Sequence, residues 1–184
     1  MRVLLDTDSV TRGLRRVAGE IVERHRGVED LVFVAVRRGG IPIARQIQRW
    51  VSELEKRAVP VGTVDITLYR DDAATALPNP RIGPSEIPGT LEGKHVILVD
   101  DVLFTGRTVR AAIDALMDYG RPRRIELCVL VDRGGRELPI APDYVVRSVE
   151  VGAGERVDVV EDEQGVQAIV QAVTAPSTPP GRPA

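Results

Sequence analysis

Continuous apolar runs predict the strands of this protein. Runs of β-branched and aliphatic residues without polar alternation are typical of strands that are buried on both faces of a parallel sheet. The run at 31–36 fits this pattern, and further strands are predicted at 61–69, 95–100, 125–132 and 144–151.

Helical spacing of apolar residues appears between these runs. The first predicted helix begins after Ser9, a suitable N-cap. Its apolar stripe consists of Val10, Leu14, Val17, Ile21 and Val22. A second helix starts near Pro42 and runs to about Arg57, and a third ends before Gly120. Strands that alternate with helices predict an α/β fold with a mostly parallel sheet, right-handed crossovers and ligands at the carboxyl ends of the strands.

Two segments rich in Pro and Gly interrupt the pattern. The first, 71–93, lies between two predicted strands, and a loop of that length in a compact domain is expected to be a flexible lid, a binding loop or a disordered segment. The second, 174–184, is polar and Pro-rich and is expected to be a disordered tail. With 184 residues and 43% hydrophobic content in the chain, the remainder, 1–173, suits a single domain.

Composition excludes several classes of function. The formal net charge of −2 gives no overall attraction to nucleic acid or to an anionic membrane. The single cysteine, Cys128, excludes an intramolecular disulfide, and neither His25 nor His95 has partners at metal-ligand spacing. No apolar run approaches the roughly 20 residues of a membrane-spanning helix. We therefore expect a cytoplasmic protein whose chemistry lies in a local motif.

The stretch HVILVDDVLFTGRTVRAAIDALMDYG, at 95–120, carries such a motif. Asp100 and Asp101 end a buried strand, and 105–108 (Thr-Gly-Arg-Thr) leads into a helix N-terminus, whose free N–H groups favour phosphate. Because carboxylates repel a phosphate, the two acids are expected to hold ribose hydroxyls or a cation carried by the substrate. A capped helix beside solvated acids is the alternative. The sequence fits neither a P-loop nor a dinucleotide fingerprint.

This stretch resembles the 5-phosphoribosyl-1-pyrophosphate (PRPP) signature of type I phosphoribosyltransferases. VGTVDITLYRDD, VRAAIDALMDYGRPRRI and VLVDRGGRELPI resemble, more narrowly, the pyrimidine operon regulator and uracil phosphoribosyltransferase (PyrR) family, over about 9–146. The resemblance implies the type I phosphoribosyltransferase fold, with helices flanking the sheet and a small hood over it. It also implies a reaction in which uracil and PRPP, which arrives with Mg²⁺, give UMP and pyrophosphate.

The resemblance assigns roles to several groups of residues. Asp100 and Asp101 would face the ribose as catalytic residues, with no other protein ligand expected for the substrate-borne Mg²⁺, and Arg70 of the lid would meet the pyrophosphate. PRPP would be bound by Asp100, Asp101, Val102, Leu103, Phe104, Thr105, Gly106, Arg107 and Thr108. The pyrophosphate loop would be Arg37, Arg38, Gly39 and Gly40. Uracil would be bordered by Val131, Asp132 and Arg133.

Three positions depart from the family pattern. The pyrophosphate loop, usually Lys-Thr-Arg-Gly, reads Arg-Arg-Gly-Gly at 37–40, and Gly135 replaces a histidine. After Tyr144 the usual Gly-Lys-x-x-Pro-Thr-Ser is also absent. The changes at Arg38, Gly39 and Gly135 favour a second hypothesis, an RNA-binding regulator whose catalysis has decayed, whereas the change after Tyr144 bears on RNA binding and its specificity. The Arg-Arg-Gly-Gly loop also looks like purine-type loops, so a phosphoribosyltransferase for a purine base is a third hypothesis.

The resemblance further implies RNA binding and self-association. Members of the family bind a stem-loop of pyrimidine-operon messenger RNA more tightly with UMP or UTP, and form dimers or larger homo-oligomers. Arg12, Arg15 and Arg16 crowd the start of the first predicted helix, where cations oppose the dipole and Gly13 lowers helix stability. A surface of this kind is a candidate for RNA phosphates. Local ion pairs, such as Arg16 with Glu20, account for it equally well.

Overall fold

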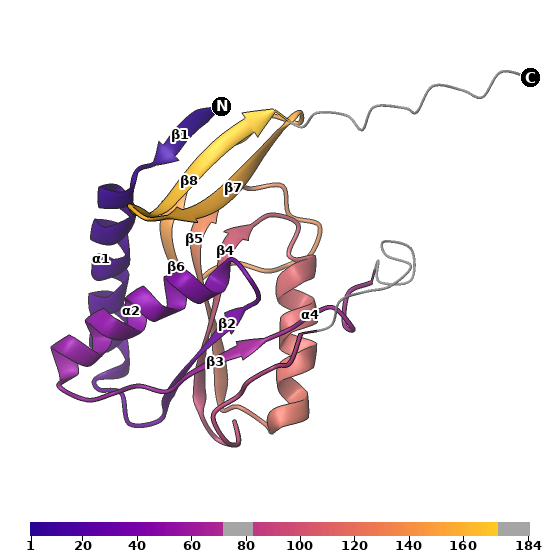
Figure 1. The fold of residues 1–184 in the computed structure, drawn as a ribbon. Helices are drawn as coiled ribbons and strands as arrows, with labels where there is room; N and C mark the ends of the chain where they lie inside the picture. The colour runs from indigo at the N-terminus through magenta and orange to yellow at the C-terminus, as the bar shows by residue number, and fades with distance from the viewer. Residues whose placement is uncertain (72–82, 173–184) are drawn as a thin grey trace, which may run out of the picture.

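A five-stranded parallel sheet forms the centre of the molecule. The computed structural model describes residues 1–71 and 83–172, and the strands run in the order β3-β2-β4-β5-β6 (Figure 1). They are β2 (Leu31–Val36), β3 (Val61–Val64), β4 (His95–Leu103), β5 (Arg124–Asp132) and β6 (Tyr144–Ser148). Each pairs in parallel with its neighbour. This confirms the α/β fold with a mostly parallel sheet.

Helices cover both faces of this sheet (Figure 1). On one face lie α1 (Thr7–His25) and α2 (Gly40–Glu55), and on the other lies α4 (Arg107–Leu116), which continues into a 3-10 turn at Met117–Tyr119. Alternate residues of the strands divide between the two cores: Phe33 and Ala35 pack in the first, and Val32 and Val34 in the second. The apolar runs are continuous because both faces of each strand are buried.

The first helix begins earlier than the sequence predicted. Its N-cap is Asp6, whose carboxylate accepts a hydrogen bond from the Ser9 N–H, so Ser9 lies inside the first turn rather than at the cap. Gly13 also has a structural reason, because a Cβ there would lie 2.3 Å from Val146 Cγ1. The glycine lets α1 approach β6 closely, which offsets its low helix propensity.

A small antiparallel sheet stands over the carboxyl end of the parallel one (Figure 1). It consists of β1 (Arg2–Leu5), β7 (Glu155–Asp162) and β8 (Gly165–Ala172), in the order β1-β8-β7. Val157, Val166 and Val170 are buried in the core that α1 shares. The hood implied by the family resemblance is therefore present, built from both ends of the described chain.

The described part of the predicted 71–93 lid lies along the edge of the sheet. Glu86 forms an antiparallel bridge with Thr63 of β3, Gly83 N donates to Asp65 Oδ2 at 2.9 Å, and Leu91 is fully buried. Residues 72–82, the rest of that segment, and the predicted tail at 174–184 lie outside the described residues. Within 1–71 and 83–172, no helix combines the length and apolarity needed to cross a membrane.

Candidate functional site

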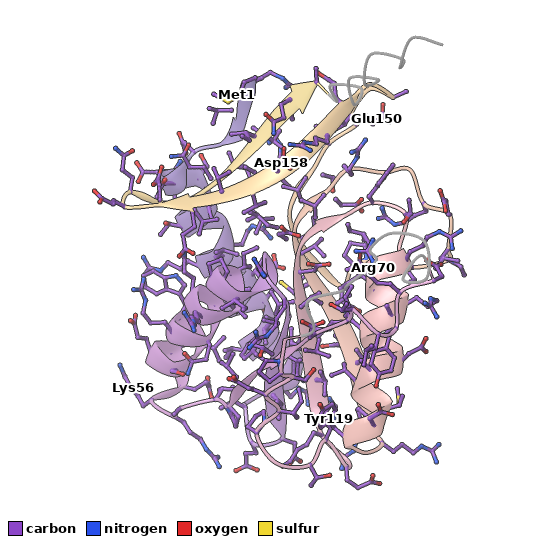
Figure 2. All side chains as sticks on the ribbon, turned by 45° about the vertical axis from the view of Figure 1, so that its right-hand side comes forward. Met1, Lys56, Arg70, Tyr119, Glu150 and Asp158 are labelled. Carbon is purple, nitrogen blue, oxygen red and sulfur yellow. The ribbon has the colours of Figure 1, made fainter. Side chains whose placement is uncertain are left out.

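The candidate residues come together at the carboxyl edge of the parallel sheet. Since β2, β4 and β5 are neighbours in the same direction, the segments that follow them, 37–40, 104–108 and 133–136, emerge side by side. The segment after β3 brings in Arg70, which Figure 2 shows beside the upper, N-terminal end of α4. Residues spread from 37 to 136 thus form one site.

The two adjacent acids of β4 differ in environment. Asp100 is only 4% exposed, and its carboxylate accepts a hydrogen bond from the Asp101 N–H at 2.9 Å. Burial, and then the charge of Asp101, raise the pKa of Asp100 well above its usual value. Asp101 is less buried, and its Oδ1 accepts from Val102 N at 2.7 Å. Asp101 is therefore the carboxylate better placed to contact a substrate.

Close packing explains the two glycines of the predicted pyrophosphate loop. A Cβ at Gly39 would lie 1.9 Å from Asp101 Oδ2, and one at Gly40 would lie 2.3 Å from the carbonyl oxygen of Val99. The loop therefore lies directly against the end of β4. The peptide bond between Arg37 and Arg38 is cis.

Backbone N–H groups and hydroxyls define the predicted phosphate cradle. Gly106 has a φ of 91°, a left-handed conformation that favours glycine, and it is the N-cap of α4. Thr105 Oγ1 accepts from Arg107 N at 3.3 Å. A cavity of about 210 Å³ is lined by Thr105, Arg107 and Thr108 together with Arg70 and Asp71. The helix N-terminus, two hydroxyls and two guanidinium groups at this cavity suit a phosphate dianion.

Arg70 belongs to a second cavity as well. This cavity measures about 310 Å³ and is lined by both arginines of the pyrophosphate loop, Arg37 and Arg38, with 65–67 and Gly83. Arg37 is held there by Thr63 and Glu86. One guanidinium group, that of Arg70, thus borders both the phosphate cradle and the pyrophosphate loop.

The stem of the lid is anchored on α4. Arg110 donates to the Tyr69 carbonyl at 2.7 Å, the Tyr69 hydroxyl bonds to Asp118, and Arg107 forms an ion pair with Asp71 at 2.5 Å. Hydrogen bonding to Asp118 raises the pKa of Tyr69, which keeps its hydroxyl a donor. The helix that carries the phosphate cradle thus also fixes where the lid begins.

The three residues of the predicted uracil loop differ in environment. The Val131 side chain is fully buried in the core, so only its backbone can face a base. Both oxygens of Asp132 are occupied: Oδ1 accepts from Gly134 N at 3.0 Å and Oδ2 from Arg136 at 2.6 Å. Arg133 lies 4.0 Å over the ring of Phe104.

Gly135, the replacement for the family histidine, is also a packing residue. Its φ is 77°, and a Cβ there would lie 2.5 Å from Cε2 of the Phe104 ring. The substitution therefore makes room for Phe104, which Arg133 covers from another side. The structure gives this departure a reason other than loss of catalysis.

Several residues at the site escaped the sequence prediction. Asp132 and Gly134 share a cavity of about 300 Å³ with Ser148, the last residue of β6, and with Val149 and Glu150 just after it. Arg136 donates to the Phe104 carbonyl, and Asp65 accepts from Gly83 N, so each side chain joins two segments that are far apart in the sequence. No spacing in the sequence indicates such contacts, because the partners meet only through the order of strands in the sheet.

The three arginines proposed for RNA stand on α1. Arg16 forms the ion pair with Glu20 at 2.5 Å and also donates to the Val145 carbonyl. Arg15 lies 5.1 Å over the Trp50 ring. Because the helix starts at Thr7, Arg12 is beyond its first turn, so the expected conflict with the helix dipole is wrong.

Comparisons with known proteins agree with this geometry. The family model described as "Phosphoribosyl transferase domain" matches residues 3–162. The "Bifunctional protein PyrR" of Geobacter sulfurreducens is 55% identical over 160 residues, which cover 87% of this chain and 90% of that protein. The protein of the same name from Pelotomaculum thermopropionicum is 49% identical over 173 residues, 94% of this chain and 96% of its own length.

Solved structures support the fold. A hypoxanthine-guanine phosphoribosyltransferase from Bacillus anthracis matches with a TM-score of 0.69 at 17% identity and covers 92% of this chain and 98% of its own. The hypoxanthine phosphoribosyltransferase of Trypanosoma cruzi matches with a TM-score of 0.68 at 18% identity, with coverage of 91% and 95%. At such identities the likeness concerns the fold alone.

Proposed function

Since this chain belongs to the PyrR family of the phosphoribosyltransferase domain superfamily, we propose that it converts uracil and PRPP to UMP and pyrophosphate. We propose as its second activity the binding of a pyrimidine-operon messenger RNA stem-loop in response to UMP or UTP. The relatives' description as bifunctional supports two activities on one chain. Both substrates and the RNA belong to the cytoplasm, where we place the protein.

The observation that carries the catalytic half is the shared position of Arg70. PRPP bears phosphate at one end of its ribose and pyrophosphate at the other, and Arg70 borders a cavity for each. The strand end between them carries Asp101, which packs against Gly39 of the pyrophosphate loop. A ribose bound at Asp101 would therefore place its two charged ends over the cradle and over Arg37 and Arg38.

Positioning and charge account for the catalysis. Transfer of a ribosyl group builds positive charge on the ribose as pyrophosphate leaves, so a fixed carboxylate beside the ring lowers the barrier. Asp101 provides that charge, while Asp100, whose pKa is raised by burial, holds the Asp101 backbone. Arg70 with Arg37 and Arg38 would stabilise the charge that gathers on pyrophosphate. Uracil would approach from the 131–135 loop on the next strand.

The site fits Mg²⁺ that arrives with PRPP. Among residues 1–71 and 83–172 no group of three or more His, Cys, Asp or Glu side chains forms a metal cage. Mg²⁺ is commonly held by one or two carboxylates together with substrate phosphates, and Asp101 with Asp100 meets that description. The ion would neutralise charge on the pyrophosphate.

The glycine packing argues against the hypothesis of decayed catalysis. Gly39 and Gly40 lie against the end of β4, and Gly135 makes room for Phe104. Two of the residues that replace family residues, Gly39 and Gly135, therefore have a packing role here. Transfer to a purine base is the remaining alternative, and the product formed from each base decides between them.

The RNA-binding half rests mainly on family membership. On α1, Arg12 and Arg15 are exposed and make no ion pair with the described residues, whereas Arg16 is held by Glu20. We assign the first contact with RNA phosphates to Arg12 and Arg15. A homo-oligomer, a dimer or larger, would repeat this surface and increase its affinity for a folded RNA.

One experiment tests the catalytic assignment. The full chain is incubated with PRPP, Mg²⁺ and, separately, uracil, hypoxanthine or guanine, and nucleotide products are separated by chromatography. UMP from uracil supports the proposal, and a purine nucleotide without UMP would replace it with the purine alternative. If no base gives a nucleotide product, only the hypothesis of an RNA-binding regulator without catalysis remains.

A second experiment tests the regulatory half. Labelled pyrimidine-leader RNA is titrated with and without UMP at moderate salt, and the Arg12→Gln/Arg15→Gln double variant is compared with Arg121→Gln, whose exposed side chain lies in the turn before β5. UMP should tighten binding, and only the double variant should weaken it. Equal binding by all three proteins would remove the α1 surface from the proposal.

A further inference from the structure

One side chain, Arg136, joins the two halves of the site. Its guanidinium group makes three hydrogen bonds: Nε donates to the Ile140 carbonyl at 2.8 Å, Nη1 to the Phe104 carbonyl at 2.9 Å, and Nη2 to Asp132 Oδ2 at 2.6 Å. Its side chain is 23% exposed. A planar fork with three separate acceptors defines the relative position of all three.

Two of these acceptors belong to the phosphate cradle. Phe104 immediately precedes Thr105, and Ile140 lies against Gly106, where a Cβ would be 3.3 Å from Ile140 Cδ1. The Thr105 carbonyl also accepts from Glu137 N at 3.0 Å and from Leu138 N at 3.1 Å. Segment 136–140 therefore wraps the outside of the cradle, and Arg136 is the residue from which it starts.

The third acceptor belongs to the base loop. Asp132 ends β5, and its two oxygens are used by Gly134 N and Arg136. A carboxylate held by these two hydrogen bonds sets the shape of the loop. A shift of the Phe104 carbonyl must therefore move Arg136 and, through it, Asp132 and the 133–135 turn.

We propose that Arg136 is a positioning residue that couples the base half-site to the phosphate half-site, so that a ligand in one raises the affinity of the other. This inference rests on the proposed function, because it takes uracil and a ribose phosphate as the two ligands. Coupling of this kind is reciprocal: each ligand changes the affinity of the other by the same factor.

The test measures the factor by which one ligand changes the affinity of the other, in a complex of uracil and ribose 5-phosphate that cannot react. Uracil binding to the full chain is measured by calorimetry without and with saturating ribose 5-phosphate, which lacks the pyrophosphate leaving group. The unmodified protein should bind uracil about 5-fold more tightly, or better, in the presence of ribose 5-phosphate, the lower range of ordinary allosteric coupling. Arg136→Gln should bring the factor to about 1.

The variants separate coupling from folding. Arg136→Lys keeps the positive charge but lacks the planar guanidinium group, so it should lose most of the increase in uracil affinity that ribose 5-phosphate causes. In Arg136→Ala, added ethylguanidinium should restore that increase. Arg121→Gln serves as the matched control and should keep the full factor. Thermal unfolding of each variant is followed in parallel, and Arg136→Lys supplies the answer if the shorter variants do not fold.

The outcomes are distinct from those of the catalytic assay. If the unmodified protein makes UMP but Arg136→Gln and Arg136→Lys keep the same coupling factor between uracil and ribose 5-phosphate, the role of Arg136 is overturned and the proposed function stands. A coupling factor of 1 in the unmodified protein would likewise overturn the role of Arg136 and leave the proposed function standing. If no UMP is formed by the unmodified protein, the proposed function itself fails.

Discussion

Two carboxylates are buried in the described part of this molecule, one at each edge of the parallel sheet. Asp100, at the carboxyl edge, is 4% exposed, and Glu126, near the amino edge of the neighbouring strand β5, is 2% exposed. Burial raises the pKa of Asp100 well above its usual value. Burial would also raise the pKa of Glu126, but hydrogen bonds, from His25 first, hold it below its usual value.

The difference lies in the partners. Glu126 is bonded by His25 Nε2 at 2.6 Å, by the Tyr144 hydroxyl at 3.0 Å and by Arg124 Nε at 3.0 Å, with Arg24 at 3.6 Å. Asp100 has the Asp101 N–H as its hydrogen-bond partner and a second carboxylate next to it. A structural acid is thus satisfied by its own chain, whereas an acid beside a substrate site keeps capacity for what binds there.

Loss of the phosphate cradle should have the largest effect. Thr105→Ala with Thr108→Ala removes two hydroxyl donors, each worth about 1.5–3 kcal/mol toward a charged group. The double variant should therefore bind PRPP at least ~100-fold more weakly, measured by calorimetry, with an unchanged melting temperature. Thr11→Ala on α1 is the control. Unaltered PRPP affinity would mean that this loop does not hold the phosphate.

Removing the satisfied acid should affect stability instead. Glu126→Ala leaves His25, Arg124 and Tyr144 without their shared partner, and breaking a buried pair commonly costs about 3–5 kcal/mol. Because the pKa of Glu126 is lowered in the fold, its contribution is present above the unfolded value near 4.5 and is lost as the pH falls. Urea unfolding at pH 7 and pH 4 should show the larger deficit at pH 7, while UMP synthesis in the folded variant stays normal.

The base loop offers a smaller, paired measurement. Gly134 and Gly135 have φ values of 71° and 77°, but a Cβ at Gly134 meets nothing within 4 Å, whereas one at Gly135 meets Phe104 at 2.5 Å. Both alanine variants pay backbone strain of about 1 kcal/mol, and Gly135→Ala should pay about 1 kcal/mol more for the contact. Equal unfolding free energies for the two variants would show that Phe104 moves aside without cost.

The sequence predicted the sheet and the 95–120 motif because both depend on local order. Continuous apolar runs identify buried strands. The motif residues 100–108 are consecutive in the sequence, so the sequence alone indicates their chemistry. The hood strands were missed, since β1 and β8 pair across nearly the whole chain. Arg136 and Glu126 were missed because each has a partner in a segment far away in the sequence, Phe104 for Arg136 and His25 for Glu126, that only the sheet brings near it.

For Asp100 we expect the opposite pH dependence of stability from that of Glu126. A carboxylic acid whose pKa is raised by folding keeps its proton in the folded state while the unfolded chain loses it, so Asp100 contributes less stability as the pH rises above about 3.8. Asp100→Asn keeps the acceptor for Asp101 N without the charge. It should raise the melting temperature at pH 7 by about 2–4 °C, the shift that ~1 kcal/mol gives in a chain of this size, and the gain should vanish near pH 3. A variant less stable than the unmodified protein at pH 7 would mean that Asp100, like Glu126, is held as an anion by its surroundings, and the contrast between the two edges would be lost.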